Sequence, residues 1–338
     1  MIITRAPMRI SFMGGGTDMP DFYKKYPGRV ISSAIDNYIY IVLNKTPLVN
    51  KISARYSISE TVDHPKDLQH TRIKEALLDL GITNNLEIGS FASLPAKTGL
   101  GSSSSFSVAL LKGLYECVGK KTDRREIAEA ACRLEIDLLK EPIGKQDQYA
   151  AAFGGLNVFQ FNADGSVDVE PVLIDYKKSI GLQDHISIFF TGITRDASSV
   201  LSGQKANISK NFETLKEMSD SVLKFRDNLM VGDFEKLGDM LNNGWKKKKT
   251  LASNVSNGII DELYDAGMNA GAWGGKLLGA GGGGCVMFLS PLDKKEAIEK
   301  KMFQIAEEKQ LKDFSKIPVN FVNSGVEIVY SADFKKYK

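Results

Sequence analysis

The sequence predicts an α+β protein built from two domains. The chain has 338 residues, which is long enough to bury two separate hydrophobic cores. Both the two-residue period of strands and the 3.6-residue period of helices recur along it. A polar stretch over residues 175–184, which we expect to be a loop, separates the two halves. We therefore expect an N-terminal domain over residues 1–180 and a C-terminal domain over residues 181–338.

The composition excludes several classes of partner. The net charge is only +3, which is too small to indicate a nucleic-acid-binding protein. The basic run Lys246–Lys249 is interpreted as a solvated helix face. No segment approaches the roughly 20 apolar residues that a membrane-spanning helix needs. We therefore expect neither a nucleic acid nor a membrane as a partner, and the sequence does not predict an oligomeric state.

The cysteines indicate the redox state of the compartment, and the histidines indicate whether a zinc site is expected. The cysteines, Cys117, Cys132 and Cys285, lie far apart and form no CxxC pattern. Such usage is typical of a reducing compartment, so we expect a cytoplasmic protein. The three histidines show no metal-ligand spacing, and we do not expect zinc.

The first half of the chain begins with strand-like stretches. Strands are expected over residues 8–13, 30–43, 51–63 and 86–91, and a helix over residues 68–80. The first strand ends in GGGTD, where three glycines allow a ligand to approach the backbone. A carboxylate at Asp18 suits sugar hydroxyls, which donate hydrogen bonds to it. The same pattern is also typical of a turn or a helix cap, and Arg9 could point into such a site or into solvent.

The most informative stretch is residues 94–111, LPAKTGLGSSSSFSVALL. Gly99 and Gly101 permit positive φ and a close approach by an anion. The apolar spacing after the serines predicts a helix, whose free N–H groups and dipole favour phosphate. A plain serine-capped helix would give a similar pattern. The loop is neither a P-loop nor GxGxxG, because Ser104 occupies the third glycine position.

Two carboxylates follow this loop. Asp123 and Glu126 form a capping box at the start of the next helix. Glu135 borders the apolar stripe of that helix, either as a solvent-edge residue or as a ligand directed inward. Asp147 is expected near the start of a second helix, which favours its ionised form. A carboxylate there can orient a hydroxyl or take its proton, or it can simply cap the helix.

The second half is expected to alternate strands and helices. We predict a hairpin turn at residues 162–165, a strand at 185–190, helices at 211–228, 233–243 and 257–270, and a further helix and two strands after residue 298. The run Gly279–Gly284 contains GxGxxG. However, the strand-like Cys285–Leu289 follows it, where a dinucleotide site requires a helix. We expect these glycines to let the backbone pack beside another loop.

Taken together, the motifs resemble those of the GHMP family of small-molecule kinases. The resemblance rests on RAPMRISFMGGGTD, LPAKTGLGSSSS and KLLGAGGGGCVMF, in this order, with Glu135 and Asp147 between the second and third. It spans nearly the whole chain. It implies an N-terminal domain like one in a small-subunit ribosomal protein and a ferredoxin-like C-terminal domain. ATP and Mg²⁺ are the implied cofactors, with ATP between the domains and its phosphates under the GLGSSSS loop.

The resemblance also implies a role for each matching residue. Asp147 orients or deprotonates the acceptor hydroxyl, and Arg9 lies near the reacting centre. Mg²⁺ is expected on Ser102 and Glu135. The nucleotide is expected at Lys97, Gly99, Leu100, Gly101, Ser102, Ser103 and Ser104. The substrate is expected at Gly15, Gly16, Thr17, Asp18, Lys145, Asp147, Arg195, Gly281 and Gly282.

Within the family, further motifs resemble the branch that phosphorylates the anomeric C1 hydroxyl of D-glycero-D-manno-heptose 7-phosphate for surface-polysaccharide synthesis. These motifs are GGGTD followed by DFY, EPIGKQDQYAAAFGG, NNGWKKKKTLASNVSN and KLLGAGGGG. Gly15 and Gly16 replace the glutamate–histidine pair of galactokinases, which argues against galactose. The second phosphate of a sugar phosphate needs a cation, for which we consider Lys97, Lys145 and Arg195.

Two alternatives stay open. A fucose- or other hexose-1-kinase would share the catalytic residues and differ in the sugar pocket. The fold also serves as a sugar sensor without turnover, and such sensors often lack a metal ligand or the aspartate. Ser102, Glu135 and Asp147 are all present, which favours an enzyme.

Overall fold

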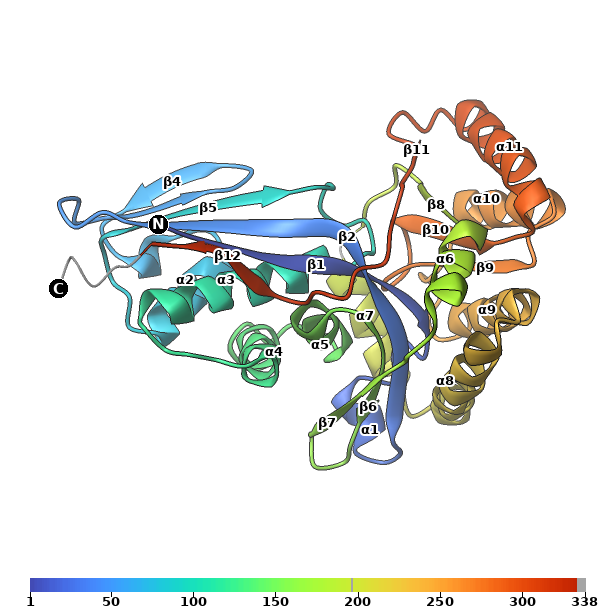
Figure 1. Cartoon of the computed structure of the whole chain (residues 1–338), viewed down its shortest axis with the longest axis horizontal. Coiled ribbons are helices and arrows are strands. Elements are labelled where there is room, and N and C mark those ends of the chain that lie inside the picture. Colours follow the sequence, from blue (N-terminus) through green and yellow to red (C-terminus); the bar gives the residue numbers. More distant parts are fainter. Residues whose placement is uncertain (196, 333–338) are drawn as a thin grey trace.

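The computed structural model describes residues 1–195 and 197–332. Two sheets lie toward opposite ends of an elongated molecule, and each has helices packed on it (Figure 1). Over the described ranges, no helix combines the length and the apolar character that crossing a membrane requires.

The larger sheet has the strand order β12-β1-β2-β5-β3-β4, and β6 and β7 extend it from β2. Its members are β1 (Ile2–Met13), β2 (Gly28–Lys45), β3 (Ile52–Arg55), β4 (Ser59–Val62), β5 (Leu86–Ala92), β6 (Leu156–Phe161), β7 (Val167–Pro171) and β12 (Glu327–Ser331). One half of β2 pairs with β5 and the other half with β6. The register between β1 and β2 shifts between Pro7 and Met8. Proline has no N–H for the ladder, so this position suits an irregularity.

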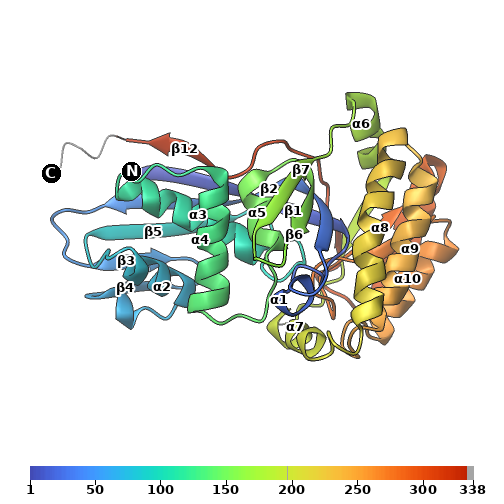
Figure 2. The same cartoon turned by 90° about the horizontal axis from the view of Figure 1, so that it is seen from below.

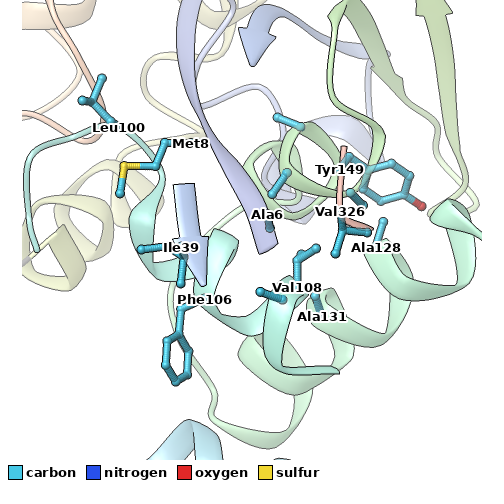
Figure 3. Packing of buried hydrophobic residues seen from close by; sticks show 14 of the residues in the cluster. Ala6, Met8, Ile39, Leu100, Phe106, Val108, Ala128, Ala131, Tyr149 and Val326 are labelled. Carbon is cyan, nitrogen blue, oxygen red and sulfur yellow. The ribbon is translucent and has the colours of Figure 1, made fainter. Parts of the chain in front are cut away.

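Helices cover one face of this sheet, as Figure 2 shows for α2 to α5. The helices of this half are α1 (Pro20–Tyr23), α2 (Thr71–Asp79), α3 (Ser102–Cys117), α4 (Arg124–Cys132) and α5 (Gln146–Phe153), with a short 3₁₀ turn at Pro65–Asp67 and a π-helical turn at Arg133–Leu138. Ala6 of β1, Val108 of α3 and Ala131 of α4 gather in the buried layer between them (Figure 3). The core of this half is therefore built between the sheet and α3 to α5.

The second sheet is antiparallel and has the order β11-β8-β10-β9. It contains β8 (Ile186–Phe190), β9 (Gly274–Leu277), β10 (Cys285–Leu289) and β11 (Ser315–Lys316). The helices are α6 (Tyr176–His185), α7 (Ala197–Ala206), α8 (Phe212–Val231), α9 (Phe234–Lys249), α10 (Gly258–Asn269) and α11 (Lys295–Glu308), with a 3₁₀ turn at Leu292–Lys294. A second buried cluster here includes Phe189, Trp245 and Phe288.

Several sequence predictions are confirmed at the level of elements. The hairpin turn joins β6 and β7, the three helices expected between residues 211 and 270 are α8, α9 and α10, and the capping box of Asp123 with Glu126 is formed. The strand β10 follows the third glycine run, as expected.

The structure differs from the sequence-based expectation around residues 175–184 and adds a pairing for residues 327–331. The prediction of a loop over residues 175–184 is wrong, because nearly all of this stretch lies in the helix α6. Asp175 caps this helix by accepting a hydrogen bond from the Lys178 N–H. Leu182 is the buried residue of the helix. Because one buried residue gives no repeat, the sequence showed no apolar helical period here. In addition, β12 pairs with β1, so residues 327–331 join the sheet of the first half although the predicted division assigns them to the second. The boundary near residue 180 itself stays a prediction.

Candidate active site

The glycine loop between β5 and α3 leaves backbone donors free at the start of a 16-residue helix. Gly99 and Gly101 have φ of +81° and +78°, in the left-handed region that glycine adopts most easily. Gly101 is the N-cap of α3 and offers no side-chain hydrogen bond to the first N–H groups. Ser104 and Ser105 are buried, whereas the two serines before them are at least partly exposed. This geometry suits an anion bound at the helix N-terminus.

The third glycine run packs directly against this loop. A Cβ on Gly279 would lie only 2.6 Å from the Cα of Gly99. The Cys285 N–H donates a hydrogen bond to the Thr98 carbonyl at 2.9 Å. The expectation that these glycines allow close packing beside another loop is therefore confirmed. The contact fixes the start of β10 against the loop that holds Gly99 and Gly101.

Arg9 and Asp147 meet beside the same loop. The Arg9 Nε and Nη2 donate to the two carboxylate oxygens of Asp147 at 2.8 and 2.7 Å, and Nη1 donates to the Gly99 carbonyl at 2.8 Å. The Arg9 side chain is 5% exposed and the Asp147 side chain 26%. Such a two-pronged pair fixes the carboxylate in orientation as well as in position. Asp147 keeps a solvent-facing part that a hydroxyl could contact.

Asp18 is held close to this pair by the turn before α5. Its carboxylate accepts hydrogen bonds from the Gly16 N–H at 3.0 Å and from the Gln146 N–H and side-chain amide, both at 3.1 Å. A Cβ on Gly144 would overlap the Asp18 carboxylate, so the turn closes on it only as glycine. Burial raises the pKa of the Asp18 carboxyl, and the charge of Asp147 adds to this, while the Gln146 N–H opposes it.

Two predicted substrate residues make their hydrogen bonds with other parts of the chain than the Arg9–Asp147 pair. The Thr17 hydroxyl donates to the Gly14 carbonyl at 2.8 Å and is fully buried, so it stabilises the glycine turn. The Lys145 Nζ donates to the Gly165 carbonyl at 2.6 Å and lies 5.6 Å from the ring centre of Tyr23. Neither of these contacts involves the Arg9–Asp147 pair, and the roles of Thr17 and Lys145 toward a substrate stay predictions.

The other predicted residues lie around the glycine loops. Arg195 is exposed, and its Cδ is 3.1 Å from the position that a Cβ on Gly282 would occupy. A Cβ on Gly281 would lie 2.7 Å from the Val255 carbonyl oxygen. Lys97 is exposed and has φ of +65°. Their roles toward a ligand stay predictions.

The Glu135 carboxylate accepts four hydrogen bonds from neighbouring side chains. It is fully buried, because the π-helical turn Arg133–Leu138 directs it inward rather than to the helix edge. It accepts hydrogen bonds from Ser104 at 2.8 Å, from Ser107 and the Gln148 amide at 2.5 Å each, and from the Arg72 Nε at 3.4 Å. Sequence reasoning missed Ser107, Gln148 and Arg72. Polar residues on otherwise apolar helices were the signal that could have found the first two.

This network bears on the expected magnesium site. A carboxylate has about four lone-pair positions, and four donors already occupy those of Glu135. The serine that contacts Glu135 is Ser104, not Ser102, whose hydroxyl takes part in no hydrogen bond of the described residues. Within those residues, no group of three His, Cys, Asp or Glu side chains is arranged to hold a metal. In this arrangement Ser102 and Glu135 do not fit a shared Mg²⁺.

Chemically, the site places a carboxylate next to a helix N-terminus whose free N–H groups suit an anion. An acceptor hydroxyl on Asp147 would lie beside an anion held by the α3 N-terminus, with the Arg9 guanidinium between them. Positioning and charge stabilisation of this kind are what phosphoryl transfer requires of a protein. The fold and the site therefore define a phosphotransferase of small molecules.

Comparison with known families agrees with this class. The model of the GHMP kinases N terminal domain matches residues 70–155, and the model of the GHMP kinases C terminal domain matches residues 225–307. Together they match half of the chain. The chain belongs to the GHMP kinases, a family whose members use ATP, and the predicted family and fold class are confirmed.

Its relatives include sugar kinases and mevalonate kinases. A D-glycero-alpha-D-manno-heptose 7-phosphate kinase of Campylobacter jejuni is 29% identical, over 96% of this chain and 98% of the relative. An L-fucokinase/L-fucose-1-P guanylyltransferase of Bacteroides fragilis is 25% identical over 87% of this chain, which corresponds to 35% of that longer protein. The crystal structure of a D-glycero-D-manno-heptose 1-phosphate kinase from Bacteroides thetaiotaomicron superposes with a TM-score of 0.80 over 98% of this chain and 100% of that one, at 23% identity, which bears on the fold alone.

Proposed function

We propose that this kinase transfers the γ-phosphoryl group of ATP to the anomeric C1 hydroxyl of D-glycero-D-manno-heptose 7-phosphate. The product is heptose 1,7-bisphosphate, for surface-polysaccharide synthesis. The chemistry is supported above all by the Arg9–Asp147 pair beside the Gly99–Gly101 loop. The choice of sugar is supported by the heptose 7-phosphate kinase that matches nearly end to end.

In this proposal the α3 N-terminus binds the phosphates and Asp147 binds the acceptor hydroxyl. The hydroxyl donates a hydrogen bond to the carboxylate, which aims its oxygen at the γ-phosphorus. The new O1–phosphorus bond forms as the bond to the bridging oxygen of ADP breaks, and ADP leaves with that electron pair. The hydroxyl proton passes to Asp147 late, once bonding to phosphorus has made it acidic. Because Arg9 donates to both carboxylate oxygens, orientation is the larger part of the Asp147 role.

The sugar is expected on the Asp18 side of the pair. Asp18 is anchored by three amide donors, so it holds the turn that presents Gly15, Gly16 and Gln146. Of the cations considered for the second phosphate of the substrate, we favour Arg195, because it is exposed beside Gly282. Lys145 is less suited, since its amine is directed at Gly165.

A hexose-1-kinase is the second candidate, and the similarity to part of a longer L-fucokinase/L-fucose-1-P guanylyltransferase favours fucose as its substrate. The two are separated by measuring ADP release with heptose 7-phosphate, L-fucose and galactose at equal concentrations. Phosphorus NMR of the product shows whether the new phosphate couples to the anomeric proton. Turnover with heptose 7-phosphate alone supports the proposal. Turnover with a free hexose alone refutes the heptose assignment, and no turnover with any sugar favours a sensor.

A further inference from the structure

Lys248 occupies a buried position on α9 that its sequence context conceals. It belongs to the run Lys246–Lys249, which the sequence analysis interpreted as a solvated face. Lys247 and Lys249 do form surface ion pairs, with Glu217 and Asp261. Lys248, however, is only 6% exposed. The interpretation is therefore wrong for this one lysine.

The position follows from the helical period. The buried stripe of α9 runs through Leu237, Leu241 and Trp245 at intervals of four residues, and Lys248 follows three residues later. Residues three and four apart share a helix face. Lys248 thus stands on the core-facing side of the helix, where an apolar residue would be expected.

The Lys248 amine lies at the junction of the two glycine loops. It donates a hydrogen bond to the Gly279 carbonyl and lies 3.5 Å from the Leu277 carbonyl. Gly279 is the residue that packs on the Cα of Gly99, whose own carbonyl accepts from Arg9. An ammonium group has three donors. Among the residues that the structure describes, these two carbonyls are the acceptors near the amine, so one N–H of Lys248 has no acceptor there.

The charges around this amine do not balance. Arg9 on β1, Lys276 on β9 and Lys248 are buried together, and the carboxylates that face Lys248 are those of Asp18 and Asp147. Asp147 is already paired with Arg9, and Asp18 accepts from amides. The Lys276 amine donates to two β1 carbonyls, at 2.9 and 2.8 Å.

Among the described residues, three basic side chains thus lie near two carboxylates, both of which already have partners. Burial, reinforced by Arg9, lowers the pKa of Lys248 to about 8 against the opposing effect of Asp147 and Asp18. Burial also lowers the pKa of Lys276 well below its ordinary value, and Lys248 and Arg9 add to this. A buried positive excess is costly unless an anion joins it.

We propose that Lys248 is a further phosphate-binding residue, whose ammonium group binds an oxygen of the terminal phosphate of ATP and neutralises its charge during transfer. The inference rests on the proposed kinase function and adds a cation from α9 to a site whose other recognised groups come from β1, α3 and α5. It explains why this core position holds a lysine. If Lys248 only held the Gly279 loop in place, it would affect the binding of ATP and of ADP equally. If its ammonium group contacts the terminal phosphate of ATP, it would strengthen the binding of ATP more than that of ADP.

The test is therefore the difference between ATP and ADP. Binding of each nucleotide, without sugar and at one magnesium concentration, is measured by calorimetry for wild type, Lys248→Met and the control Lys247→Met. A hydrogen bond to a charged group corresponds to about a tenfold or larger change in affinity. We expect Lys248→Met to weaken ATP binding by that factor and ADP binding by less than about threefold, with Lys247→Met unchanged. Equal weakening of ATP and ADP, or no weakening of either, overturns the proposal.

A second measurement uses wild type and so does not depend on the variant folding. At pH 8 about half of a group with a pKa near 8 is protonated, and a bound anion completes its protonation. Calorimetry in HEPES and in Tris, which differ in ionisation enthalpy, then gives an uptake of about half a proton with ATP and less with ADP. Identical proton uptake with both nucleotides contradicts the proposal. Neither experiment contains a sugar, so the results of both are independent of the heptose assignment. Failure of that assignment would be recognised separately, by the absence of turnover with heptose 7-phosphate.

Discussion

Replacing Asp147 by asparagine should remove catalysis while preserving the fold and ATP binding. Asn has the same shape as Asp but carries no charge, and only its carbonyl oxygen can still accept from Arg9. The Arg9 guanidinium, 5% exposed, keeps the Gly99 carbonyl as a second partner. A hydroxyl placed on the amide would lose the charged acceptor that orients it.

The magnitudes follow from the burial of the pair. Breaking a fully buried ion pair costs about 3–5 kcal/mol. Because the Asp147 side chain is 26% exposed and one hydrogen bond survives, we expect a loss of about 2 kcal/mol in the free energy of unfolding. Loss of a positioned acid–base group lowers kcat by about 100- to 10,000-fold.

The assay is ADP release at saturating ATP and heptose 7-phosphate, with urea unfolding in parallel. Asp227→Asn is the matched control, because Asp227 forms an ion pair with Arg226 and is 63% exposed. The control should keep normal kcat and lose less than about 1 kcal/mol of stability. A kcat for Asp147→Asn close to wild type would refute the assigned role, as would an equal loss of activity in the control.

Three further predictions concern the surroundings of the pair. Glu135→Ala removes the shared acceptor of four donors and should lower the free energy of unfolding, measured in urea, by about 3–5 kcal/mol. A loss below about 1 kcal/mol would contradict the importance of this network. Gly279→Ala places a Cβ 2.6 Å from the Gly99 Cα at a φ of +70°, so ATP should bind more weakly in calorimetry, and unchanged binding would show that the loops need not touch. The pKa of Lys248 falls from 10.5 unfolded to about 8 folded, so at this group the unfolded chain binds more protons between these values, and the Lys248 contribution to stability should rise with pH from about 8 to 10.5. Lys248→Met should flatten this rise, and an identical pH profile would contradict it.

Much of the fold followed from local patterns. The hairpin at residues 162–165, the capping box and helices α8 to α10 depend on near neighbours in sequence, and each formed where it was expected. The helix α6 was missed because one buried residue, Leu182, gives no period to detect. The return of β12 to β1 was also missed, since a strand's period does not say which strand it pairs with.

The site was harder to predict than the fold because its partners are distant in sequence. Arg9 and Asp147 were both named, but their hydrogen bonds join positions 138 residues apart. Glu135 was placed at the edge of a helical stripe. The π-helical turn then rotated it into the core, where Ser104 rather than Ser102 contacts it. Lys248 was missed because its charged neighbours suggested solvent, although its spacing from Leu241 and Trp245 indicated burial.

The measurement that tests the central claim most directly is steady-state ADP release by the wild-type protein with D-glycero-D-manno-heptose 7-phosphate, followed by phosphorus NMR of the product. We predict rapid turnover and a new phosphate signal coupled to the anomeric proton. Turnover on a free hexose but not on the heptose phosphate, or phosphorylation at any position other than C1, would contradict the account.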